Sequence, residues 1–224
     1  MKFVVQENRE EKAKKIEAVL QDATGGDVAG LRILDIGIGN GEIAEYFARR
    51  NQVDGVDVLD QRSHPRSSVR FSLVRDEELP LEDGSFDVVI SNHVIEHTPN
   101  QEKHLKEIGR TLKRSGICYL ATPNVLFPWE CHHKTWLIHY GGSKCYHRYL
   151  KWRGIYEEPL YLLSHRSVKN LALNHFHVQE YTHRIIKEPA RFGFYVPFLN
   201  RLPLALLACL NWASQTNVFV LYRK

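Results

Sequence analysis

The sequence contains no long hydrophobic run, which excludes several classes of protein. Residues 1–8 include no sustained apolar segment, so we expect no signal peptide and a cytoplasmic location. The longest apolar run, from Leu202 to Leu210, is interrupted by Pro203 and is much shorter than a membrane-spanning helix. The sequence therefore predicts a soluble protein without a transmembrane segment.

Cysteine is scarce and positive charge is not concentrated. The four cysteines among 224 residues show no close pairing, so we expect them to be thiols. The formal net charge is only +4, without the basic stripe that nucleic-acid-binding proteins carry. These features favour a single domain over residues 1–224, with a sizeable core and no nucleic-acid partner.

Residues 31–50 are the stretch around which we expect the domain to be organised. Residues 31–36 are mostly apolar and lead into a glycine-rich turn, which is the pattern of a buried parallel strand. Gly37, Gly39 and Gly41 follow, and apolar residues then recur at helical spacing as far as Arg50. A strand, a glycine loop and a helix predict a site where a nucleotide-like ligand approaches the backbone.

The spacing of these glycines separates two cofactors. Dinucleotide-binding loops have the pattern Gly-x-Gly-x-x-Gly, whereas this loop has Gly-x-Gly-x-Gly. Asp35, two residues before the first glycine, would repel a pyrophosphate but suits a positively charged ligand. Both features disfavour an NAD-dependent oxidoreductase, which stays as a third alternative. The stretch resembles motif I of the class I S-adenosylmethionine-dependent methyltransferases, whose cofactor carries a sulfonium and an amino group.

Three further stretches carry the same resemblance. Residues 53–58 predict a second strand that ends near Asp57, twenty positions after Gly37, where Rossmann-like folds bind ribose through a carboxylate. Residues 75–92 combine an acidic loop, Leu-Pro, an Asp-Gly turn and a fourth strand, and are similar to the second and third motifs of small-molecule methyltransferases. Residues 112–124 repeat the family's Leu-Lys-x-x-Gly, strand, Thr-Pro-Asn pattern. The resemblance covers residues 31–124.

The resemblance implies a fold and a set of cofactor contacts. The fold is α/β, a Rossmann-like three-layer sandwich with a seven-stranded mixed sheet, whose last strand, residues 218–222, is antiparallel and inserted between its neighbours. The family has an acid where Arg75 stands, so Asp76 or Glu77 is expected to receive the adenine amino group. The cofactor-binding residues that the resemblance implies are Asp35, Gly37, Gly39, Gly41, Asp57, Asp76, Glu77, Asn92 and His93.

Local patterns predict further element boundaries. We expect Thr98 to cap a helix that ends at Gly116, because proline and glutamine stand at its first and third positions. Ser164 is expected to cap a helix that ends at Asn174, and residues 176–185 to form the sixth strand.

Residues 125–163 form an insertion after strand five, which we interpret as a substrate lid over the cofactor core of residues 30–124. The Cys/His cluster of this insertion raises the hypothesis of a zinc site. Paired Cys-x-x-Cys or His-x3-His elements are missing, however, so we predict no metal. His132 and His133, together with His93, are the candidates for a catalytic base, because histidine titrates near neutral pH. The members of the cluster are Cys131, His132, His133, His139, Cys145 and His147.

Residues 187–214 form a second insertion, between strands six and seven. Leu202, Leu206, Leu207 and Leu210 share one helical face. We expect this helix to pack on the lid. The alternatives are a dimer interface, or contact with a membrane surface through residues 194–213.

Together these features predict an S-adenosylmethionine-dependent methyltransferase acting on an oxygen or nitrogen of a small-molecule acceptor. An in-line displacement needs orientation and exclusion of water, not a fixed nucleophile, so the lack of an evident catalytic triad agrees with it. The main alternative is a non-catalytic binding subunit with the methyltransferase fold, which Arg75 favours. The aromatic lid suits a flat aromatic molecule, a quinone or a sugar, and the apolar second insertion suits a lipid-linked acceptor.

Overall fold

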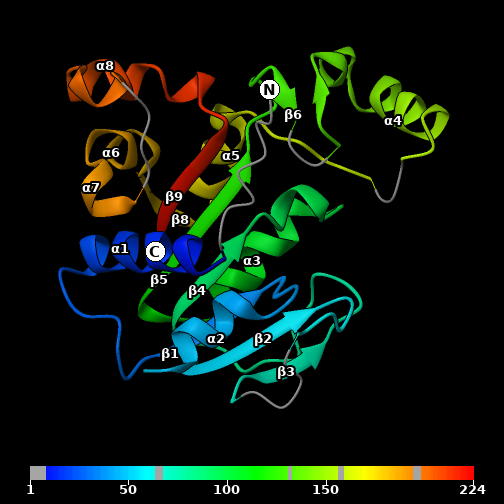
Figure 1. Ribbon diagram of the computed structural model, residues 1–224. Coiled ribbons are helices and arrows are strands. Elements are labelled where there is room, and N and C mark those ends of the chain that lie inside the picture. The colour runs from blue at the N-terminus through cyan, green and yellow to red at the C-terminus, as the bar shows by residue number, and fades with distance from the viewer. Residues whose placement is uncertain (1–8, 64–67, 131–132, 156–158, 194–197) are drawn as a thin grey trace.

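A seven-stranded sheet forms the centre of the protein in the computed structural model, which describes residues 9–63, 68–130, 133–155, 159–193 and 198–224 (Figure 1). Within this sheet the described strand pairs are parallel except the two pairs of the last strand, which is antiparallel to both neighbours. The predicted mixed α/β sheet is therefore confirmed. In spatial order the strands are β3 (Arg70–Leu73), β2 (Gln52–Asp57), β1 (Arg32–Ile36), β4 (Phe86–Asn92), β5 (Leu112–Pro123), β9 (Thr216–Arg223) and β8 (Phe176–Glu180).

Helices cover both faces of the sheet and complete three layers. Successive strand residues point to opposite faces, so Ile33 belongs to one hydrophobic core and Leu34 to the other. The first core is covered by α1 (Arg9–Thr24), α2 (Glu42–Ala48), α6 (Thr182–Lys187) and α7 (Pro189–Phe192). The second is covered by α3 (Gln101–Thr111) and α5 (His165–Leu173). None of the helices in the described ranges is both long and apolar enough to cross a bilayer.

The prediction that Thr98 caps the helix after β4 is wrong. The Thr98 hydroxyl instead donates to the Ile95 carbonyl and closes a short 3-10 helix, Ile95–His97. Asn100 caps α3, because its side-chain oxygen accepts a hydrogen bond from the Lys103 amide at 3.0 Å.

The same helix ends earlier than predicted, at Thr111 and not at Gly116. The amides of Gly84 and Ser85 donate to the last carbonyls of the helix, those of Arg110 and Thr111. Because the turn before β4 satisfies these carbonyls, the chain can leave the helix and enter β5 at once.

The sixth strand is also shorter than predicted, because β8 ends at Glu180. Beyond it, the Val218 amide donates to the Thr182 side-chain oxygen at 2.9 Å and not to a backbone carbonyl. The backbone ladder stops there, and residues 182–185, predicted as strand, belong to α6. The predicted cap of the preceding helix is confirmed, since the Ser164 hydroxyl accepts from the Ser167 amide.

Both insertions are built from short elements. The lid contains β6 (Trp129–Glu130), β7 (Thr135–Trp136), a 3-10 helix (Ile138–Gly141) and α4 (Ser143–Trp152), with a small core of its own around Tyr146 and Leu150. The second insertion contains 3-10 helices at Leu199–Arg201 and Asn211–Ala213, on either side of α8 (Leu204–Cys209). The expectation that this helix packs on the lid is wrong, since α8 packs mainly on α6, and of its predicted face Leu207 is the buried leucine.

Candidate active site

The loop between β1 and α2 is shaped by its glycines. Gly37, Gly39 and Gly41 have φ angles of +69°, +55° and +85°, a region that residues with a Cβ rarely adopt. A Cβ at Gly37 would also collide with Val94 Cγ2 at 2.5 Å. A Cβ at Gly39, in contrast, would have no neighbouring atom within 4 Å. The backbone at Gly39 is therefore open to a ligand.

Asp57, the last residue of β2, directs its carboxylate at this loop. Oδ2 accepts the Gly39 amide at 2.8 Å, and Oδ1 accepts the Leu59 amide at 3.3 Å. A carboxylate offers about four acceptor sites, so Asp57 can hold the loop and still accept hydrogen bonds from ligand hydroxyls. The ribose contact of Asp57 stays a prediction.

Asp35 lies buried in β1 beside the same loop, only 4% exposed. Burial, reinforced by the negative charge of Asp57, raises the pKa of Asp35 to about 7, while the charge of Arg9 opposes the shift. Near neutral pH this carboxyl group is therefore poised to ionise when a cation binds next to it.

The Asp35→Asn variant is expected to be more stable than the parent protein by roughly 2–4 kcal/mol at pH 8 and by a smaller margin of about 1–2 kcal/mol at pH 5. The unfolded chain loses the Asp35 proton near its ordinary pKa of 3.8, whereas the folded protein keeps it up to about pH 7. The unfolding free energy therefore falls as the pH rises through this window, and asparagine removes that cost.

Urea denaturation at both pH values measures this effect. Glu82→Gln removes an acid that is exposed and is the matched control. Equal stability of Asp35→Asn and the parent at pH 8 would mean that the Asp35 carboxylate carries no desolvation cost.

The carboxyl ends of β4 and β5 bring a histidine to the same edge of the sheet. Asn92, at the end of β4, pairs with Ala121 of β5. His93 follows with a φ of +60°, and its amide donates to the Ala121 carbonyl at 2.8 Å. A left-handed backbone is uncommon for a residue other than glycine and is found disproportionately at functional sites.

Glu96 supports the His93 side chain and was missed by the sequence analysis. Its side chain is fully buried, Oε2 accepts the Thr122 hydroxyl at 2.9 Å, and Oε1 lies 3.3 Å from His93 Nδ1. Because Nδ1 faces this carboxylate, a positively charged His93 ring is stabilised there. The available signal was an acid three residues after a candidate histidine, within a segment that leads into a helix.

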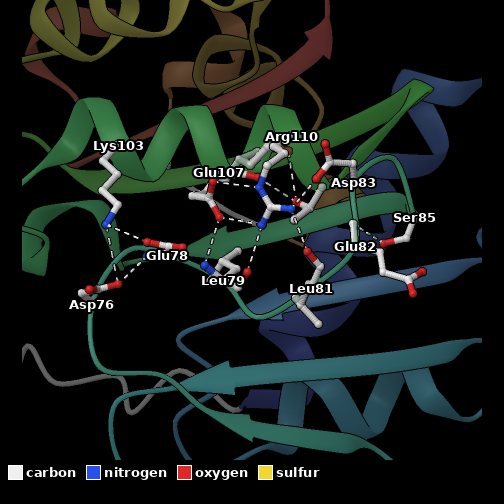
Figure 2. A network of polar contacts seen from close by, with 12 residues as sticks. Asp76, Glu78, Leu79, Leu81, Glu82, Asp83, Ser85, Lys103, Glu107 and Arg110 are labelled. Carbon is white, nitrogen blue, oxygen red and sulfur yellow. Dashed lines mark hydrogen bonds and ion pairs between the residues drawn. The ribbon is translucent and has the colours of Figure 1, made fainter.

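The loop between β3 and β4 is fixed to α3 by Arg110, a second residue that the sequence analysis missed. Figure 2 shows its guanidinium among backbone carbonyls and acids of that loop. It donates to the carbonyls of Leu79 and Leu81 at 2.9 and 2.7 Å and to Asp83 at 2.6 Å. Glu107, on the same helix, accepts two further bonds from it and receives the Leu79 amide. Because Glu107 and Asp83 accept from it, the pKa of Arg110 is raised further above its ordinary value.

The two acids proposed for the adenine contact lie in this anchored loop. Asp76 accepts the Glu78 amide at 2.7 Å and lies 3.7 Å from Lys103 Nζ (Figure 2). Glu77 accepts the Asn100 amide at 3.1 Å. Both carboxylates keep free acceptor positions, so the structure leaves the choice between them open.

The other candidate bases lie in the lid, and His132 falls outside the described residues. The His133 ring is nearly buried, with Nδ1 3.4 Å from Glu130 Oε2 and 3.3 Å from the Tyr146 hydroxyl. Of the remaining cluster, His139 Nε2 lies 3.1 Å from the carbonyls of Val125 and Phe127. Within the described part of the chain, no group of three His, Cys, Asp or Glu side chains converges as metal ligands do.

Comparison with known proteins adds to this geometry. The model of a methyltransferase domain matches residues 34–120, inside the predicted cofactor core. The solved 1,6-didemethyltoxoflavin-N1-methyltransferase of Burkholderia thailandensis, with bound 1,6-didemethyltoxoflavin and S-adenosylhomocysteine, superposes with a TM-score of 0.54 at 15% identity, over 96% of this chain and 80% of that one. Residues 34–120 therefore match a methyltransferase domain in sequence, and the chain has the class I methyltransferase fold.

Curated relatives match this chain at higher identity than this solved structure does. An uncharacterized methyltransferase of Mycobacterium sp. (strain KMS) is 32% identical over 148 residues, which is 63% of this chain and 58% of the relative. A ubiquinone biosynthesis O-methyltransferase of Neisseria meningitidis is 32% identical over 110 residues, 44% of this chain and 46% of the relative. The chain thus spans about half the length of the curated relatives it matches.

The residues of the methyltransferase domain fit S-adenosylmethionine better than a dinucleotide. Asp35 and Asp57 interact electrostatically beside the glycine loop, which would repel a pyrophosphate and attract an ammonium or sulfonium group. The open backbone at Gly39 leaves room for the cofactor, and Asp57 has acceptor capacity for ribose hydroxyls.

Arg110→Ala is expected to destabilise the methyltransferase domain by about 2–4 kcal/mol, because it leaves Glu107 and two loop carbonyls without their donor. Lys106→Ala, an exposed lysine on the same helix, is the control and should change stability by less than about 0.5 kcal/mol. Thermal and urea unfolding measure both. A loss for Arg110→Ala no larger than that of the control would contradict the anchoring role.

Proposed function

We propose that the protein is an S-adenosylmethionine-dependent methyltransferase that transfers a methyl group to an oxygen or nitrogen of a small-molecule acceptor. The observation that carries the proposal is the pair of carboxylates, Asp35 and Asp57, set against an open glycine loop at the end of β1. A ligand with a cationic end and a ribose satisfies both acids.

One residue or pair of residues is assigned to each expected cofactor contact. Asp35 would face the amino group, Asp57 the ribose hydroxyls, and Asp76 or Glu77 the adenine amino group. The glycines at 37, 39 and 41 would allow the cofactor to approach the backbone, and Asn92 and His93 would border the methyl group. When bound, the cofactor supplies a methyl group activated by a positively charged sulfur, which leaves as a neutral thioether.

The chain's own contribution to the reaction is a base, orientation and exclusion of water. His93 would take up the proton of the acceptor hydroxyl when that oxygen is methylated. The buried Glu96 carboxylate, 3.3 Å from Nδ1, stabilises the charged ring that results. His132 and His133 are retained as alternative bases from the lid.

Transfer to oxygen is the preferred form of the proposal. The similarity to a ubiquinone biosynthesis O-methyltransferase supports transfer to oxygen. The pairing of His93 with the Glu96 carboxylate also supports it, because a hydroxyl acceptor needs a base whereas a neutral amine does not. The acceptor would lie beside the end of β5, in a shallow depression of about 430 Å³ that Leu126, His139, Tyr140 and Trp212 line. Two exposed aromatic rings there suit a flat aromatic acceptor.

A screen for methyl transfer tests the proposal. The protein is incubated with S-adenosylmethionine labelled in the methyl group and with panels of phenols, quinols, sugars and amines. Calorimetric titrations with S-adenosylhomocysteine and with NAD are run in parallel. Transfer of the label to one class of acceptor supports the enzyme. Binding of S-adenosylhomocysteine without any label transfer supports the non-catalytic binding subunit. Binding of NAD alone would make the oxidoreductase the first hypothesis.

The binding subunit stays as a second candidate because of Arg75. Where the family has an adenine-binding acid, this chain has an exposed arginine. Asp76 and Glu77 stand next to it, so we place the enzyme first.

A further inference from the structure

The two insertions expose large apolar side chains at one end of the molecule. Figure 1 places α8 and the lid helix α4 at the same end, beyond β5 and β9. The insertions meet there, since His139 and Tyr140 of the lid line the same depression as Trp212 of the second insertion. Trp152 is 78% exposed and Phe198 72%. The exposed set is Trp136, Leu137, Tyr140, Trp152, Phe198, Leu204, Leu206, Leu210 and Trp212.

The helix α4 points cations outward at this end. Tyr146 and Leu150 are buried in the core of the lid. Residues of the opposite side recur at helical spacing and are exposed. They are Lys144, Arg148, Lys151 and Trp152.

The charge of these segments has one sign. Residues 133–155 and 198–213 contain no aspartate or glutamate. Arg201 lies with its guanidinium 5.5 Å from the centre of the Phe198 ring, so a cation accompanies that exposed aromatic as well. The basic residues of the two segments are Lys134, Lys144, Arg148, Lys151, Arg153 and Arg201.

We propose that residues 133–155 and 198–213 form a face, here called the apolar-basic face, that binds the surface of an anionic lipid membrane. Tryptophan, phenylalanine and leucine side chains bind at the boundary between headgroups and acyl chains, and lysine and arginine attract anionic headgroups. A second copy of this chain is a poor occupant, because it would present the same positive charge to the face. The proposal does not depend on the methyltransferase activity.

Cosedimentation with vesicles tests the proposal on the full chain. We expect binding to vesicles of equal parts phosphatidylcholine and phosphatidylglycerol, little binding to phosphatidylcholine alone, and release as salt is raised. Replacing Lys144, Arg148 and Lys151 together by Gln should lower the partition coefficient roughly a hundredfold, at about fivefold per charge. Replacing Trp136, Trp152 and Phe198 together by Ser should abolish binding to the mixed vesicles.

A matched charge variant separates a specific face from net charge. Arg49, Lys106 and Arg114 are exposed and lie outside the face, so their joint replacement by Gln should leave vesicle binding within about twofold of the parent. Thermal unfolding confirms that each variant is folded. Three results would overturn the proposal: no binding of the parent to anionic vesicles, equal loss in the control variant, or a dimer in sedimentation velocity that the face variants dissociate while vesicle binding is absent.

Discussion

Asp57→Ala is expected to weaken the binding of S-adenosylhomocysteine about a thousandfold. Two charge-assisted hydrogen bonds to the ribose hydroxyls contribute about 1.5–3 kcal/mol each, and a tenfold change in affinity corresponds to about 1.4 kcal/mol. The alanine variant also loses the acceptor for the Gly39 amide, which fixes the glycine loop. Isothermal titration calorimetry with the parent and the variant measures the difference.

Asp57→Asn separates the two roles of this side chain. Its amide oxygen can still accept the Gly39 hydrogen bond, but its NH₂ group cannot accept from a ribose hydroxyl. We expect a loss of at least tenfold with the loop intact. Asp60→Asn, an exposed acid three residues further on that pairs with Arg62, is the control and should bind as the parent does. Parent-like affinity in Asp57→Ala would remove Asp57 from the cofactor site.

The sheet and the glycine loop could be predicted because their causes are local. Strands buried on both faces need mostly apolar runs, and residues 33–36, apart from Asp35, and 88–90 supply them. The positive φ angle of Gly37 and its close approach to Val94 require a residue without a Cβ, so the conformation of the loop can be inferred from the glycine in the sequence. The antiparallel insertion of β9 came from the family resemblance and not from any local pattern.

Arg110 and Glu96 could not be predicted because their partners are distant in the sequence. Arg110 bonds to carbonyls about thirty residues earlier, and Glu96 bonds to Thr122, 26 residues later. No periodicity encodes such pairs. The wrong prediction of Thr98 as a helix cap had a different cause. Thr98 and Asn100, two positions apart, could each cap a helix, and the Thr98 hydroxyl bonds to the 3-10 helix before α3 instead.

His93→Gln is expected to lower kcat for a hydroxyl acceptor by two to three orders of magnitude and to leave S-adenosylhomocysteine affinity within about threefold. Glutamine keeps a similar size but cannot take up the proton. His177→Gln, on the exposed side of β8, is the control. It should keep both the kcat and the S-adenosylhomocysteine affinity of the parent. Steady-state kinetics with saturating cofactor, together with calorimetry, separates the loss in kcat from any loss in binding.

Glu96→Gln distinguishes a positioning role from a structural one. Glutamine can accept the Thr122 hydrogen bond but no longer places a negative charge 3.3 Å from His93 Nδ1. We expect kcat to fall about tenfold while the KM for the acceptor and the affinity for S-adenosylhomocysteine stay as in the parent, because the charged ring loses its carboxylate. A merely structural role would change KM and affinity together with kcat. If His93→Gln instead kept full activity, the proton would go to a lid histidine or the acceptor would be an amine that arrives neutral, and repeating the measurement in His133→Gln would separate these two cases.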